Sequence, residues 1–163
     1  MPVLGSIRLQ SGTMLLGGHF RMPIEYNYQH QSSLKLDFGP EFAYFVLQGF
    51  SVGGRVGLAY TPLDASTAPR APVLWDASVL VKYYYEMVDN LYLFTGLDLG
   101  LSDNEFVLVE LRWSLGFPLG VLWAVNEHVG LVFGAPVKVQ FKTTSFFEKV
   151  VVTPGYFGLV GFF

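Results

Sequence analysis

The residues best placed to do chemistry in this sequence are eleven charged side chains that recur at alternate positions of strand-like segments. Alternate residues of an extended strand point to the same face, so these charges share one face of a predicted sheet. If that face is enclosed, the charges must pair or form hydrogen bonds to offset their lost hydration. The set comprises Lys35, Asp37, Glu41, Arg55, Asp76, Lys82, Glu86, Asp98, Glu110, Arg112 and Lys138.

Two kinds of chemistry are compatible with these charges. Opposite charges can neutralise one another in a salt-bridged plug, with Glu41, Arg55, Lys82, Asp98 and Arg112 at its centre. Alternatively, the charges could line a narrow path for protons or ions. We favour the plug, because side chains of this size fill the interior of a small barrel.

Metal, cofactor and nucleic-acid chemistry have no support in the sequence. Cysteine is absent, and the three histidines are not at ligand spacing. We interpret His19 as a strand residue near a rim and His128 as a polar turn residue. A net charge of −3 without any basic run argues against nucleic acid as a partner. We therefore expect no metal and no cofactor.

Composition indicates a chain surrounded by lipid rather than by water. Hydrophobic residues make up 52% and charged residues 14%, whereas about a quarter of an ordinary soluble domain is charged. No run of roughly 20 apolar residues is present, as a membrane helix requires. Aromatic residues reach 17%, and 18 glycines are scattered through the strand-like segments. We expect one domain, residues 1–163, made entirely of strands.

The strands are predicted from a period of two. In residues 91–101, Leu91, Leu93, Leu97, Leu99 and Leu101 share one face, and smaller or polar residues share the other. Helical spacing would scatter these leucines around the helix. Similar alternation predicts eight strands within residues 6–20, 33–46, 50–60, 73–87, 91–101, 107–119, 129–141 and 150–163.

The predicted connections alternate between short and long. Residues 46–49, 88–90 and 125–128 are short turns that contain Gly, Asn or Asp. Between them lie longer links at residues 21–32, 62–72, 102–105 and 142–149. Short turns on one side and longer loops on the other are typical of outer-membrane barrels, in which the longer loops are extracellular.

Volume decides which face of the sheet points outward. The interior of an eight-stranded barrel only just accommodates side chains, and the face rich in Leu, Val, Phe, Tyr and Trp would not fit inside it. The opposite face carries Gly, Ala, Ser and the charges, which suit a narrow lumen. We therefore predict an all-β, eight-stranded, antiparallel up-and-down transmembrane β-barrel.

The chain resembles the small outer-membrane barrels typified by outer-membrane protein X and the transmembrane domain of outer-membrane protein A. The resemblance covers nearly all of the chain and rests on the strand spacing, residues 39–45 with the following turn and residues 52–54, and the terminal Phe163. In that group a terminal aromatic residue, preceded by apolar residues at alternate positions, is recognised by the barrel-assembly machinery. Phe157, Leu159 and Phe163 match this signal, whereas Gly161 departs from it.

The resemblance implies a bacterial outer-membrane location with both termini in the periplasm. Outer-membrane lipid and lipopolysaccharide are then the surroundings, and an extracellular or periplasmic protein is a possible partner. Residues 1–5 lack the charged and apolar regions of a secretory signal peptide, so we expect the sequence to be the mature part of an exported protein.

A non-enzymatic role in envelope structure, or in binding through extracellular loops, is our first hypothesis. The alternative is a lipid A-modifying enzyme. A lipid A deacylase would need a His-x-Ser pair with a carboxylate, the serine acting as nucleophile and the histidine as base. His30 and Ser32 have that spacing, but they lie in the first predicted link, whereas the motif of that family is near the C-terminal strands. A soluble ligand-binding barrel is the third hypothesis.

Overall fold

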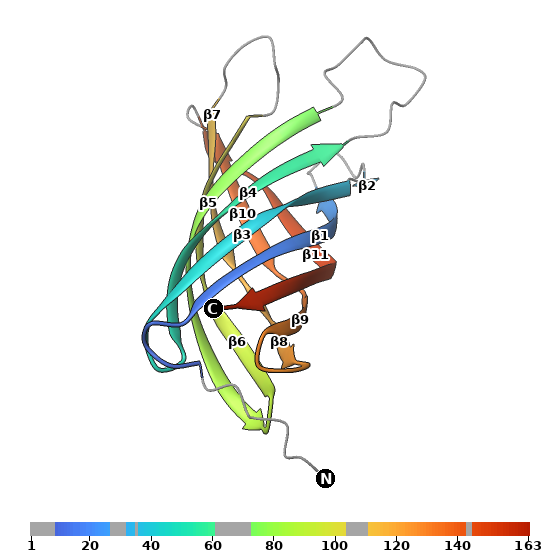
Figure 1. Ribbon diagram of the computed structural model, residues 1–163. Coiled ribbons are helices and arrows are strands. Elements are labelled where there is room, and N and C mark those ends of the chain that lie inside the picture. Colours follow the sequence, from blue (N-terminus) through green and yellow to red (C-terminus); the bar gives the residue numbers. More distant parts are fainter. Residues whose placement is uncertain (1–8, 27–31, 35, 61–72, 104–110, 143–144) are drawn as a thin grey trace.

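The computed structural model describes residues 9–26, 32–34, 36–60, 73–103, 111–142 and 145–163 (Figure 1). Within these residues every regular element is a strand, and no helix is long and apolar enough to cross a bilayer. The strands are β1 (Met14–Tyr26), β2 (Ser32–Leu34), β3 (Leu36–Leu47), β4 (Phe50–Tyr60), β5 (Val73–Val88), β6 (Leu91–Asp103), β7 (Leu111–Phe117), β8 (Leu119–Ala124), β9 (Val129–Gly134), β10 (Val137–Lys142) and β11 (Ser145–Phe162).

The strands form a closed antiparallel barrel, because β11 pairs with β1 from Leu15 opposite Phe162 onward. Three pairs of elements each occupy one strand position in the barrel wall. β2 and β3 both pair with β1, β7 and β8 both pair with β6, and β9 and β10 both pair with β11. The ring therefore has eight strands with up-and-down connections, as the alternation in the sequence predicts.

Three tight connections lie together at one end of the barrel, which we call the short-turn end. Turns at residues 48–49 and 89–90 and a bend at residues 125–128 connect neighbouring strands there. Gly49 and Asn90 have φ of 70° and 67°, the left-handed region that tight hairpin turns require. The last residues also lie at this end, since Phe162 donates a backbone hydrogen bond to His128. The opposite end, near residues 26, 60, 73 and 103, is the long-link end (Figure 1).

Several strand bounds differ from the prediction. β1 runs from Met14 to Tyr26, through part of the predicted link at residues 21–32, and β11 begins at Ser145 inside the predicted link at 142–149. The sequence pattern places Arg21 in a link, whereas in the structure its side chain is buried on the inner face of β1. The strand predicted at 107–119 continues to Ala124, with an interruption at Pro118. Of the predicted links, residues 27–31, 62–72, 104–105 and 143–144 lie outside the described residues, as do residues 107–110 of the predicted strand.

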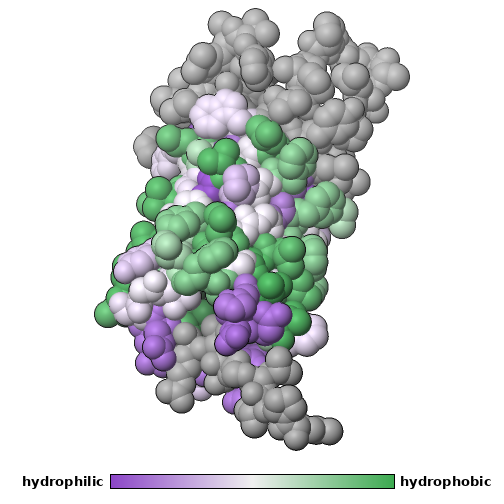
Figure 2. Space-filling view, in the orientation of Figure 1, coloured by the Kyte–Doolittle hydropathy of each residue, from purple (hydrophilic) through white to green (hydrophobic). Residues whose placement is uncertain are grey.

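Large apolar side chains cover the outer face of the wall. Leu16, Phe42, Val79, Leu99 and Leu159 have exposed fractions of 44–58% although they sit in the middle of strands. Figure 2 shows such hydrophobic residues gathered over the middle of the barrel, with hydrophilic residues toward the short-turn end. The predicted orientation, with the apolar face outward, is the one that the structure has.

The aromatic residues at the edges of this apolar belt, together with ordinary strand geometry, give its approximate height. Trp75 and Tyr85 lie outward on β5, and Trp113 and Trp123 lie outward on β7 and β8; the members of each pair are ten residues apart. Ten residues of strand extend about 33 Å. At the usual tilt of about 35–45°, that length spans about 23–27 Å along the barrel axis, close to the apolar band of outer-membrane barrels.

The inner face has two layers. Toward the short-turn end, large apolar side chains pack together, including Phe45, Tyr84, Phe94 and Leu122, none more than 5% exposed. Leu9 joins them, and its carbonyl accepts a hydrogen bond from the amide of Gly49. The charged side chains form the second layer, farther toward the long-link end. The interior is thus more apolar than the prediction of a lumen lined with small and charged residues.

Burying a charge on the outer face tests this assignment of the two faces. We expect Val79→Arg, in the middle of the belt, to lower the free energy of unfolding in lipid vesicles by about 2–4 kcal/mol. Met87→Arg, on the same face of β5 but beyond Tyr85, should cost about 0–1 kcal/mol. Equilibrium denaturant unfolding measures both, and equal costs at the two positions would contradict the assignment.

Candidate functional site

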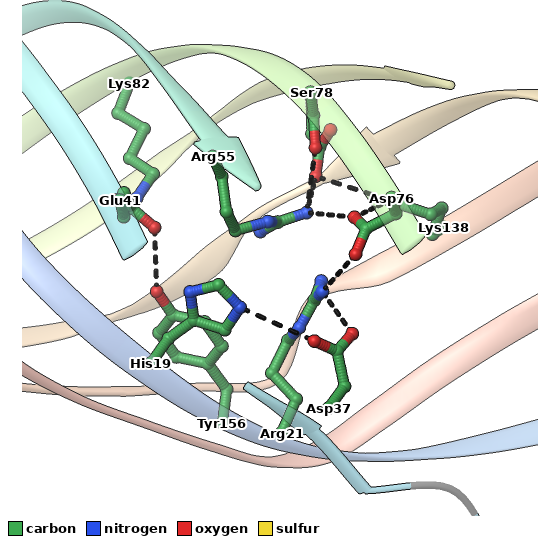
Figure 3. Close-up of polar contacts among 11 residues, drawn as sticks. His19, Arg21, Asp37, Glu41, Arg55, Asp76, Ser78, Lys82, Lys138 and Tyr156 are labelled. Atoms are coloured by element: carbon green, nitrogen blue, oxygen red, sulfur yellow. Dashed lines mark hydrogen bonds and ion pairs between the residues drawn. The ribbon is translucent and has the colours of Figure 1, made fainter. Parts of the chain in front are cut away.

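The buried charge layer is assembled from strands all around the barrel. Its members sit on alternate positions of their strands and therefore share the inner face (Figure 3). The contributing residues are His19 and Arg21 from β1, Asp37 and Glu41 from β3, Arg55 from β4, Asp76, Ser78 and Lys82 from β5, Asp98 from β6, Lys138 from β10 and Tyr156 from β11.

Asp76 lies at the hub of the larger group of contacts. One carboxylate oxygen accepts a hydrogen bond from Arg21 Nη2 at 3.1 Å, and the other lies 3.8 Å from Arg55 Nη2 and 3.7 Å from Lys138 Nζ. Arg21 also pairs with Asp37. Through Asp76, cations from three different parts of the wall are held together.

Asp98 is the second carboxylate of this group. It accepts a hydrogen bond from Arg55 at 2.6 Å and lies 3.8 Å from Lys138 Nζ. Arg55 donates another bond to Ser78 Oγ at 3.2 Å. The guanidinium thus joins β4 to the neighbouring strand β5 and to β6, the next strand along the wall.

A second group is built around Glu41. Lys82 pairs with one carboxylate oxygen of Glu41, and the hydroxyl of Tyr156 donates to the other at 3.0 Å. The Tyr156 ring stacks on His19 with centroids 5.9 Å apart, and His19 Nε2 lies 3.7 Å from Asp37. The stacked rings therefore connect the two groups. Lys82 Nζ also lies 5.2 Å from the Phe94 ring centroid, at the boundary with the apolar layer.

Deep burial is what makes these contacts obligatory. Arg55, Lys82 and Asp98 are 3–4% exposed, so water cannot compensate a lost partner. Glycine makes room for the charges: a Cβ at Gly57 would lie 2.0 Å from Asp76 Oδ1. The placement of glycines and charges on one parity is therefore a packing requirement of a narrow lumen.

The predicted lumen charges differ in their burial and in their contacts. It brings Asp37, Glu41, Arg55, Asp76, Lys82, Asp98 and Lys138 into the contacts above. Arg112 is also buried, at 6% exposure. Glu86 instead is exposed at the short-turn end, where it accepts a 3.3 Å hydrogen bond from Tyr92. Lys35 and Glu110 lie outside the residues whose side chains are described.

Sequence reasoning missed Arg21, His19 and Tyr156. The sequence pattern places Arg21 in a link and His19 near a rim, yet both are buried, at 6% and 4% exposure. The signal was available, because both residues share the parity of Leu15 and oppose the outward Leu16, Phe20 and Met22. Nothing in the sequence indicated that Tyr156 would reach Glu41, a contact between residues 115 positions apart.

Other predicted sites can also be located. His128 is exposed in the bend at residues 125–128, near Glu127. Of the His-x-Ser pair, His30 lies outside the described residues, and Ser32 begins β2 without a described side chain. Among the described residues, no group of three or more His, Asp or Glu could hold a metal ion. Phe157, Leu159 and Phe163 all point outward, with exposed fractions of 43%, 55% and 75%.

Comparisons with known proteins agree with this architecture. Residues 7–156 match a family described as Domain of unknown function (DUF2715). No curated protein matches in sequence.

Several solved structures have a similar fold, among them three from bacteria. Neisserial surface protein A (NspA) has a TM-score of 0.67 at 13% identity, over 93% of this chain and 99% of that chain. The N-terminal β-barrel domain of Pseudomonas aeruginosa OprF has a TM-score of 0.60 at 10% identity, over 94% of this chain and 98% of that chain. Ail, the attachment invasion locus protein of Yersinia pestis, has a TM-score of 0.58 at 14% identity, over 94% of this chain and 100% of that chain. The chain thus has the fold of the small outer-membrane β-barrels.

Breaking the Glu41 and Lys82 pair tests whether the charge layer depends on pairing. We expect Glu41→Gln or Lys82→Met alone to lower the free energy of unfolding by about 3–5 kcal/mol, because each substitution leaves a buried charge without its partner. The double variant should lose clearly less than the sum of the two, since no unpaired charge remains. Equilibrium unfolding of the four proteins in detergent micelles measures this coupling, and strictly additive losses would show that the two side chains act independently.

Proposed function

Since the chain belongs to the DUF2715 family, whose description names no activity, we propose a function from its geometry: a non-enzymatic bacterial outer-membrane barrel with a closed lumen. The observation that carries this proposal is the pair of layers inside the wall. Phe45, Tyr84 and Leu122 fill the short-turn half, and the ion pairs around Asp76 and Glu41 fill the adjoining section.

The outer face supports placement in a bilayer. Lipid offers no hydrogen-bond partners, so a membrane wall needs a closed ladder and apolar outward side chains. The pairing of β11 with β1 meets the first requirement, and the belt between Trp75 and Tyr85 meets the second. Lipid and lipopolysaccharide are the surroundings that this face fits.

The short-turn end fits the periplasmic side, because outer-membrane barrels have short periplasmic turns and longer extracellular loops. Both termini then lie in the periplasm. Outward Phe157, Leu159 and Phe163 on the last strand fit the assembly signal of such barrels, so the barrel-assembly machinery is the expected partner during insertion.

If the lumen is closed, the parts of the barrel that can contact other molecules are its outer face and its two ends. With no passage for a solute, the protein can stabilise the envelope as a rigid body or present its long links to an extracellular partner. Loops carried on a rigid scaffold are the usual place for such binding. We therefore assign the barrel a structural role, with the long-link end as the binding end.

Planar-bilayer recording tests the closed lumen. We expect the reconstituted protein to give no steady openings of porin size, and Arg55→Ala to remain silent, because the apolar layer still blocks the passage. A general porin inserted in the same bilayers is the positive control. Steady openings of the wild-type protein would refute closure.

The absence of enzymatic activity can be checked on lipid A itself. Cells that express the wild-type protein and cells that express Ser32→Ala or His30→Ala should give the same lipid A mass spectrum. A lipid A species that the wild-type protein generates, and that disappears in both variants, would instead establish a deacylase.

A further inference from the structure

Strand β5 extends farther than its neighbour β4 at the short-turn end. The register between the two strands ends at Tyr83, and the Tyr84 amide donates one further hydrogen bond to the Gly49 carbonyl. β5 itself continues to Val88, paired with β6. Figure 1 shows the hairpin of β5 and β6 projecting past the other short turns. Within the described chain, residues 85–88 of β5 therefore have no partner strand on the β4 side, and we call this stretch the open edge.

The open edge presents backbone groups to water. Both backbone groups of a residue in an antiparallel strand point to the same neighbour, and successive residues alternate between the two neighbours. Because Tyr84 donates toward β4, the amide and carbonyl of Glu86 also point to the β4 side, beyond the end of that strand. Tyr85 marks the border of the apolar belt, so these groups lie outside the part of the wall that faces lipid chains. An edge of this kind can take up one more strand.

A pocket of about 330 Å³ lies beside the open edge. Its lining includes four tyrosines, a carboxylate and an amide, from Tyr83, Tyr84, Tyr85, Tyr92, Glu86 and Gln48. The Tyr92 hydroxyl donates a hydrogen bond of 3.3 Å to one carboxylate oxygen of Glu86, which holds that carboxylate against the pocket wall. The pocket thus combines the π faces of phenol rings with a negative charge. This combination binds an ammonium or a guanidinium group.

The charges around the pocket have the same sign. Glu86, Asp89 and Glu127 are all exposed at the short-turn end. Every Lys and Arg among the residues that the structure describes lies instead in the charge layer or nearer the long-link end. A cationic ligand is therefore attracted to this end of the barrel. A second copy of this chain, by contrast, would bring a similar set of carboxylates to it.

Two apolar side chains of the open edge are uncovered as well. Met87 and Val88 follow Tyr85, at the border of the belt, and have exposed fractions of 56% and 61%. Lipid chains do not reach them outside the belt. A strand added at the open edge would cover them, whereas a small amine in the pocket would not.

We propose that the open edge and its pocket form one docking site for an extended peptide segment of another protein. The segment adds to β5 as a strand, accepting a hydrogen bond from the Glu86 amide and donating one to the Glu86 carbonyl. A Lys or Arg side chain of the segment enters the pocket, between the tyrosine rings and the Glu86 carboxylate. The inference rests on the proposed function only for the location of the partner, which is the periplasm if the short turns face that side.

Titration with a peptide probe tests the site. The probe is a blocked seven-residue peptide of alternating Thr and Val, with Lys in place of the central Val. Amide NMR spectra of the full chain in nonionic detergent micelles should show saturable shifts at residues 84–88 and slower hydrogen exchange of the Glu86 amide. A probe with N-methyl groups on alternate residues should bind at least about tenfold more weakly, because main-chain hydrogen bonds supply the affinity of an added strand. No saturable binding of the Lys probe would overturn the proposal.

Two carboxylate variants provide a matched comparison. Glu86→Gln should weaken binding of the Lys probe about tenfold. Glu127→Gln removes the same charge from an exposed position at the same end but outside the pocket, and should change binding by less than about twofold. Equal losses in the two variants would reduce the effect to a general attraction between charges and would overturn the site.

Other results would assign the open edge to a different occupant and thereby also overturn the proposal. A probe with Glu at its centre that binds as tightly as the Lys probe would remove the role of the pocket. Binding that appears only after deletion of residues 1–8 would assign the edge to a segment of the chain itself. Shifts caused by phosphatidylethanolamine in the micelles, but not by the probe, would assign the pocket to a lipid headgroup. Conducting openings in a bilayer would contradict the closed lumen but leave this binding unaffected.

Discussion

Closure of the wall by β11 and β1 is the constraint on which the other features of this structure depend. A ladder that returns to its first strand leaves no edge with unpaired backbone groups, as a lipid environment requires. Closure also separates every strand into an outer and an inner face. Because apolar residues such as Leu99 and Trp113 occupy the outer face, the residues at the alternate positions, including a large set of charges, lie on the inner face.

The inner face meets this demand by layering. Near the short turns it is packed with aromatic and aliphatic side chains, which need no partners. Farther along the axis, the buried carboxylates pair with cations from other strands, as Asp76 does with Arg21 and Lys138. Both layers remove space from the lumen, and for this reason we propose a scaffold role rather than transport.

Much of the fold could be predicted because a period of two is a local property. The outward Leu93, Leu97 and Leu99 and the inward Asp98 follow directly from alternation. The ends of strands are harder to predict from the sequence. Arg21 is typical of a loop residue unless the interior of the barrel is known to be polar. Pairings across the lumen, such as Tyr156 with Glu41, depend on the register of distant strands, which no local pattern encodes.

The central claim is that the outer face contacts lipid chains while the charges are sealed inside. Tryptophan fluorescence in vesicles of brominated lipids tests it most directly, because Trp75, Trp113 and Trp123 all point outward near the edges of the belt. We predict strong quenching, greater for bromine near the headgroups than for bromine deep in the chains. Fluorescence that brominated chains leave unchanged, but that a water-soluble quencher abolishes, would contradict the account.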